Sequence, residues 1–191
     1  QAWCAPETTR RLITMKDNLK KHVTAALFAA LTFAATMAVR IPTPGTSGYI
    51  HPGDALVILS GVILGPSSGF LAAGIGSALA DLLGGYFVYV PVTFVIKGLI
   101  ALFCGLIYQK AGRIPGFRYP AVAAGGVVDI FLVAGGYFLC ESFLYGPAGA
   151  LASVPANLIQ GVSGLIISLL LYPVLMAVPE VKQMAQTHQS L

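Results

Sequence analysis

The chain has 191 residues, of which 57% are hydrophobic and only 9% are charged. Soluble domains usually carry about a quarter charged residues, so this composition excludes an ordinary soluble protein and indicates a membrane protein. The net charge of +4 comes from scattered residues and does not indicate nucleic-acid binding. We therefore expect one polytopic membrane domain with an all-α fold of six transmembrane helices.

The first 14 residues do not fit this pattern. They lack an N-terminal Met and a long apolar core, so they do not form a signal peptide. Met15 begins "MKDNLKKHVTAALFAAL", a basic flank followed by an apolar helix. We expect residues 1–14 to be an extension from cloning or from a misassigned start, and residues 15–191 to form the membrane domain.

The first predicted span, residues 22–39, carries alanines at intervals of four residues. Small residues at this spacing lie on one helix face and let another helix approach closely. That helix could belong to the same protein or to a partner. The alanines of this ridge are Ala26, Ala30, Ala34 and Ala38.

The second predicted span, residues 54–64, is too short to cross a hydrocarbon core of about 30 Å. It follows the turn "HPGD", in which Asp54 is a candidate N-cap. The sequence "GPSSG" then leads into a third span over residues 69–83. Small residues recur along both spans, which predicts close internal packing: Gly61, Gly65, Gly69, Ala72, Gly76, Ala80 and Gly84.

The remaining predicted spans cover residues 91–108, 121–143 and 156–176. A polar loop, "QKAGRIPGFRYP", separates the fourth span from the fifth. The segment "YGPAGALASVP" is rich in Gly and Pro, and we expect it to be a loop between the fifth and sixth spans.

Positive charges predict the orientation of the six spans. Of the positive charges outside the spans, all but Arg40 fall on one face, so by the positive-inside rule both termini and the loop at 110–118 are cytoplasmic. The loops at 40–53, 84–91 and 145–155 then lie together on the outer face. The charges that decide this are Lys16, Lys20, Lys21, Lys110, Arg113, Arg118 and Lys182.

Aromatic and amide side chains gather near the predicted outer face. Asn157 and Gln160 stand three residues apart on one helix face just inside it, where they could bind a ligand or hydrogen-bond to another helix. The tyrosines could form an interfacial aromatic belt or, with convergent polar groups, a small-molecule pocket. They are Tyr49, Tyr86, Tyr89, Tyr137 and Tyr145.

Five ionisable residues lie in or at the ends of apolar spans: Asp54, Asp81, Lys97, Asp129 and Glu141. A charge at a helix centre costs about 2.5–3.5 kcal/mol, so such groups usually face a partner or a wet cavity. Lys97 and Glu141 are candidates for ligand contact or for a structural ion pair, and we expect a structural role for Asp129.

The same aspartates raise the possibility of an intramembrane aspartyl-type enzyme. Such an enzyme needs two carboxylates close together. Because the spans put Asp54 at the outer lip and Asp129 in the inner half, we expect them to be separated. The sequence has no Walker A, GxSxG or HExxH motif. Its cysteines, Cys4, Cys104 and Cys140, have no metal-type spacing, so we expect neither a cofactor nor a metal.

The stretch "GYIHPGDALVILSGVILGPSSGFLAAGIGSALADLLGGYFVYVPVTFVIKGLIALFCGLIY" together with "VPANLIQG" resembles the substrate-binding (S) components of energy-coupling factor (ECF) transporters, in the riboflavin- or hydroxymethylpyrimidine-type branch. The resemblance covers about residues 20–178. It implies a six-helix protein of the bacterial cytoplasmic membrane that binds a vitamin or vitamin precursor near the outer face.

The resemblance also implies partners. S components of this family dock on a membrane coupling (T) subunit carried by two cytoplasmic ATPase subunits, topple in the membrane and release substrate inside. It places the docking surface on the alanine ridge of the first span. It makes the segment 40–53 a lid, which its prolines stiffen.

The sequence thus predicts a vitamin-capture subunit without catalytic chemistry. We favour a hydroxymethylpyrimidine- or pyridoxine-like ligand over riboflavin; the alternatives from other classes are the aspartyl-type enzyme and a structural or assembly protein. The residues predicted to contact the ligand are Tyr49, His51, Tyr86, Tyr89, Lys97, Tyr137, Glu141, Asn157 and Gln160.

Overall fold

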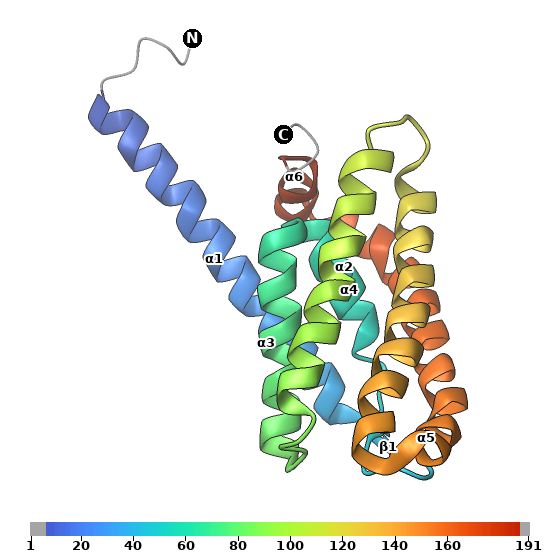
Figure 1. Cartoon of the computed structure of the whole chain (residues 1–191). Coiled ribbons are helices and arrows are strands. Elements are labelled where there is room, and N and C mark those ends of the chain that lie inside the picture. The colour runs from blue at the N-terminus through green and yellow to red at the C-terminus, as the bar shows by residue number, and fades with distance from the viewer. Residues whose placement is uncertain (1–6, 188–191) are drawn as a thin grey trace.

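The computed structural model describes residues 7–187 and is almost entirely helical (Figure 1). Residues 1–6 of the expected extension, including Cys4, lie outside the described residues, whereas residues 7–14 already belong to the first helix. The elements are α1 (Glu7–Ala38), β1 (Ile41–Pro42), β2 (Tyr49–Ile50), α2 (Asp54–Leu64), α3 (Pro66–Gly84), α4 (Val90–Ala111), α5 (Arg118–Met176) and α6 (Pro179–Thr187).

Four of these helices are long and apolar enough to cross a membrane: Asn18–Ala38 of α1, α3, α4 and α5. The 59-residue α5 runs down one side of the bundle and back up, so it supplies both the fifth and the sixth predicted spans (Figure 1). The all-α membrane fold is confirmed.

The turn inside α5 is shorter than the sequence indicated. Only Gly146 leaves helical geometry, with φ 80° and ψ 160°, and the helix resumes at Pro147. The prediction of a loop over 145–155 was therefore wrong for most of that segment. Proline is favoured in the first turn of a helix, where its missing N–H is no loss, and Gly146 supplies the left-handed φ that the reversal needs.

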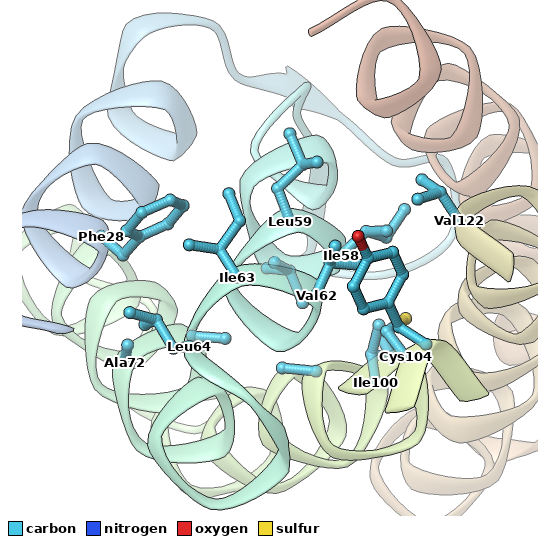
Figure 2. Close-up of a cluster of buried hydrophobic side chains, with 14 of the residues drawn as sticks. Phe28, Ile58, Leu59, Val62, Ile63, Leu64, Ala72, Ile100, Cys104 and Val122 are labelled. Carbon is cyan, nitrogen blue, oxygen red and sulfur yellow. The ribbon is translucent and has the colours of Figure 1, made fainter. Parts of the chain in front are cut away.

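The short α2 lies at the centre of the molecule. Every residue of α2 except Leu56 is buried, and its apolar side chains contact α1, α3, α4 and α5. Figure 2 shows Ile58, Leu59, Val62 and Ile63 surrounded by side chains of the neighbouring helices. α2 is therefore an inner element, which explains its length, because it does not have to match the bilayer thickness.

Close packing around α2 depends on glycine. A Cβ atom at Gly61 would lie 2.0 Å from the carbonyl oxygen of Ala101 on α4, and one at Gly105 would lie 2.8 Å from the carbonyl oxygen of Gly61. At Gly76, a Cβ would lie 2.4 Å from the carbonyl oxygen of Ala29. The small-residue ridges therefore bring α2 against α4 and α3 against α1.

The two ends of the bundle differ. Figure 1 shows the start of α1, the connection between α4 and α5, and α6 at one end, and the β-hairpin and the turn of α5 at the other. The first end carries the basic residues that predict the cytoplasmic face, such as Lys110 and Arg113. We call the opposite end, with the hairpin, the outer end.

We expect Gly61→Ala to destabilise the protein, because the added methyl group has no space between α2 and α4. Overpacking of this kind costs about 1–3 kcal/mol, so the thermal unfolding midpoint in detergent should fall. Gly135→Ala is the matched control, since nothing lies within 4 Å of its Cβ position on α5. Equal midpoints for the two variants would contradict this packing.

Candidate functional site

A hairpin between α1 and α2 covers the outer end of the bundle. Its two short strands pair Ile41 with Ile50 and Pro42 with Tyr49 in antiparallel register. Its tip is packed against the returning segment of α5, because a Cβ at Gly45 would lie 2.8 Å from Cβ of Ala152. The segment predicted to be a lid therefore has a defined, closed conformation.

Beneath the hairpin, two tyrosines hold two carboxylates. Tyr49 on β2 donates a 2.7 Å hydrogen bond to Oδ1 of Asp81, near the end of α3. Tyr89, just before α4, donates a 3.0 Å hydrogen bond to Oε1 of Glu141. The other carboxylate oxygen of Glu141 accepts a hydrogen bond from Ser153. Each carboxylate thus accepts a hydrogen bond from a tyrosine of another part of the chain.

A polar cavity lies between these groups. Its free volume is about 20 Å³, enough for a water molecule but too small for an aromatic heterocycle. Side chains from the hairpin and from α3, α4 and both segments of α5 converge on it. The lining residues are Thr43, Gly48, Tyr49, His51, Asp81, Tyr89, Thr93, Tyr137, Glu141 and Asn157.

Six of the nine residues predicted to contact ligand line this cavity, and three do not. Tyr86 stacks on Tyr49 from outside, with ring centroids 4.5 Å apart. Lys97 and Gln160 belong to a buried network under the cavity. Tyr145, which the aromatic cluster also included, is exposed.

Sequence reasoning did not place Thr43, Gly48, Asp81 or Thr93 in the site. The position of Asp81, four residues before the loop "GYFVYVP", was the available signal. Thr93 lies one turn into α4, where its hydroxyl is 2.9 Å from that of Tyr137. The two polar groups stand on neighbouring helices, which a linear sequence does not reveal.

The buried network is centred on Asp54 and Lys97. Lys97 Nζ lies 2.5 Å from Asp54 Oδ1, and both side chains have no exposed surface. Gln160 donates a 2.8 Å hydrogen bond to Asp54 Oδ2, and its own oxygen accepts one of 3.1 Å from the backbone N–H of His51. The amide of Gln160 therefore joins the ion pair to the end of the hairpin.

This network corrects two expectations. Asp54 is not the N-cap of α2; Gly53 takes that position, and the aspartate side chain points into the interior. The ion pair of Lys97 is with Asp54 and not with Glu141. Glu141 instead accepts hydrogen bonds from the hydroxyl groups of Tyr89 and Ser153. The charge of Lys97 is neutralised by Asp54, below the cavity.

The expected separation of Asp54 and Asp129 was also wrong. A Cβ at Gly164 would lie 2.7 Å from Asp54 Cβ and 3.1 Å from Asp129 Oδ2, so this glycine stands between two neighbouring aspartates. Neither aspartate lines the cavity, and Asp54 is committed to Lys97 and Gln160. This arrangement does not favour a catalytic dyad.

His51 lies at the inner edge of the hairpin and is buried. Burial, assisted by the nearby charge of Lys97 and opposed by Asp54, lowers the pKa of His51 to about 4, so the ring is neutral at physiological pH. Its Nδ1 accepts a 3.1 Å hydrogen bond from the backbone N–H of Gly53, which places the ring hydrogen on Nε2.

Comparison with known proteins identifies the family of this chain. Residues 16–177 match the family model described as ECF-type riboflavin transporter, S component. The chain belongs to this family of S components. It is therefore a membrane protein whose family and fold are those of transporter components that capture vitamins.

Two relatives are similar over most of the chain. An uncharacterized protein of Pyrococcus woesei is 39% identical over 132 residues, which are 69% of this chain and 85% of that protein. A thiamine precursor transporter of Lactococcus lactis is 26% identical over 159 residues, 83% of this chain and 89% of the relative.

The fold is similar to that of a solved S component. The crystal structure of the S component for biotin from an ECF-type ABC transporter superposes with a TM-score of 0.54 at 18% identity. The match covers 83% of this chain and 93% of that one. The substrates named for these matches differ, so membership in the family leaves the ligand open.

We expect Lys97→Met to lower stability strongly, because it leaves the Asp54 carboxylate buried without a counter-charge. Breaking a buried ion pair on one side costs about 3–5 kcal/mol. The double variant Lys97→Met with Asp54→Asn should regain much of this loss, since it buries no charge. Thermal unfolding of the ligand-free protein measures both, and a double variant no more stable than the single one would contradict the pairing.

Proposed function

We propose that this S component captures a small vitamin precursor, of hydroxymethylpyrimidine or pyridoxine type, on the outer side of the membrane for ATP-driven uptake. The observation that carries the proposal is the polar, tyrosine-lined cavity closed by the hairpin at the outer end. Aromatic rings with a few convergent polar groups are the usual composition of a small-molecule site. The relative that transports a thiamine precursor supports the same ligand type.

Ligand access requires the hairpin or the side chains beneath it to move, because the closed cavity is too small for a heterocycle. The contacts that hold the hairpin to the bundle are both polar and apolar. They include the Tyr49–Asp81 and His51–Gln160 hydrogen bonds and the packing of Gly45 on Ala152. The hairpin can thus act as a lid whose opening exposes the cavity.

Riboflavin is the second candidate, favoured by the description of the matching family model. Its three-ring system is much larger than a single heterocycle and would need a wider opening of the same site. Purifying the protein from a rich culture and identifying bound small molecules by mass spectrometry distinguishes the two. Purified protein that carries no vitamin and binds neither riboflavin, pyridoxine nor hydroxymethylpyrimidine would contradict the proposal.

We expect Asn157→Ala to weaken ligand binding about five- to 150-fold while changing stability little, because Asn157 lines the cavity. Gln160→Ala should weaken binding too, but with a loss of thermal stability, since Asp54 and the His51 N–H lose their shared partner. Ser163→Ala, on the same helix but outside the cavity lining, is the control for equilibrium binding. Wild-type affinity in Asn157→Ala would show that the ligand does not bind at this cavity.

The same proposal assigns a docking face to α1. All four alanines of the ridge are exposed. Ala26 and Ala30 line an apolar groove of about 500 Å³ between α1 and α3, together with Phe33, Leu71 and Ile75. A helix of the T subunit fits such a surface, because small residues let apolar helices approach closely within the membrane. The two ATPase subunits would join the complex through that T subunit.

We expect Ala30→Trp to abolish uptake while leaving ligand binding by the isolated protein unchanged, because a large ring fills the groove without reaching the cavity. Leu27→Trp is the matched control, since Leu27 is exposed on α1 but does not line the groove. Uptake is measured in cells that also express a T subunit and its ATPases. Normal uptake by Ala30→Trp would show that docking uses another face.

A further inference from the structure

The charged groups around the cavity are unbalanced. Two carboxylates line it, those of Asp81 and Glu141, and no Lys or Arg stands among the described residues that do so. His51, the remaining ionisable nitrogen of the lining, is neutral because burial lowers its pKa to about 4. The cavity therefore has an excess of negative charge.

The two nearest cations do not correct this imbalance. Lys97 forms an ion pair with Asp54 in the buried network, so its charge is neutralised below the cavity. Arg40 lies on the outer side of the hairpin, where its guanidinium carbon is 5.9 Å from the centre of the Tyr49 ring. Tyr49 thus separates Arg40 from the cavity.

The carboxylates differ in how far they are satisfied. Both oxygens of Glu141 accept hydrogen bonds from hydroxyl groups, those of Tyr89 and Ser153. Oδ1 of Asp81 accepts from Tyr49, and the Thr93 hydroxyl lies near the same carboxylate. Its Oδ2 is buried and has no hydrogen-bond partner, although Asp81 lines the cavity. Buried polar atoms are nearly always paired, so this oxygen points to a donor that arrives with the ligand.

We propose that Asp81 recognises an amino-substituted nitrogen heterocycle that can carry a positive charge, and that the paired acidic residues exclude phosphorylated and carboxylated compounds. The inference rests on the proposed function and narrows its ligand class. A 4-aminopyrimidine donates hydrogen bonds through its exocyclic amino group, and protonation at the ring nitrogen para to that group spreads positive charge onto it, which strengthens its hydrogen bond to a carboxylate. Each carboxylate oxygen accepts more than one hydrogen bond, so Tyr49 can keep its contact.

This recognition distinguishes the two ligand types of the proposed function. Pyridoxine has hydroxyl groups but no exocyclic amino group, so it offers Asp81 a poorer match. A phosphate ester would bring negative charge next to two carboxylates in a site with little water, where like charges repel strongly. The site should therefore take the free amino alcohol and reject its phosphate.

The test measures binding of a matched set of probes by isothermal titration calorimetry. The probes are 4-amino-5-hydroxymethyl-2-methylpyrimidine, its 4-oxo analogue, its phosphate monoester, pyridoxine and riboflavin. We expect the wild type to prefer the amino compound over the 4-oxo analogue by about ten- to 100-fold and to bind the phosphate more weakly still.

The variant Asp81→Asn should lose this preference, to within about threefold, because it exchanges an acceptor for a donor. Asp129→Asn makes the same chemical change at a buried aspartate outside the cavity lining and should keep the wild-type preference. If Asp81→Asn does not fold, the wild-type comparisons of amino with oxo compound and of alcohol with phosphate still decide the ligand class.

Three outcomes would overturn the inference: equal binding of the amino and oxo probes, binding of the phosphate as tight as that of the alcohol, or an unchanged preference in Asp81→Asn. Tight binding of riboflavin or pyridoxine without the aminopyrimidine would leave vitamin capture standing and remove only this inference. Failure of the wild type to bind any of the five probes would contradict the proposed function itself.

Discussion

The buried ion pair between Lys97 and Asp54 is the interaction on which the outer half of the molecule depends. It joins α2 to α4, and the amide of Gln160 extends it to α5 and to the hairpin backbone at His51. Two charges away from water are costly unless every remaining donor and acceptor is matched. Matching them fixes three helices and the base of the hairpin relative to one another.

The pair also determines the electrostatics of the site above it. Because Lys97 is neutralised from below, the carboxylates of Asp81 and Glu141 face the cavity without a protein cation. Had Lys97 paired with Glu141, one of the two arrangements that the sequence left open, only the carboxylate of Asp81 would have faced the cavity without a cation. The pairing of Lys97 with Asp54 thus determines the charge of the cavity.

Hydropathy was sufficient to predict the membrane fold, the inner position of α2 and the end of the molecule where the tyrosines gather. The depth that hydropathy predicts for a residue along its helix did not reveal which residues lie close together across the bundle. Asp54 and Asp129 are neighbours because Gly164 lets α2 and α5 approach, although their chain positions suggested different depths. The segment 147–155 was misread because its prolines, which often mark loops, are tolerated in a helix that begins at Pro147.

The closed hairpin has a kinetic consequence. In the proposed function, the closed cavity of about 20 Å³ takes up ligand only during the fraction of time that the hairpin is open, so the observed affinity is the intrinsic affinity reduced by that fraction. The rates of capture and escape then follow the opening of the hairpin more than the strength of any single contact. Because the closed cavity leaves too little space for a heterocycle, closure and occupancy oppose each other, and the Tyr49–Asp81 hydrogen bond favours closure. In the proposed function, a partner that stabilises the closed hairpin would therefore favour release of the ligand.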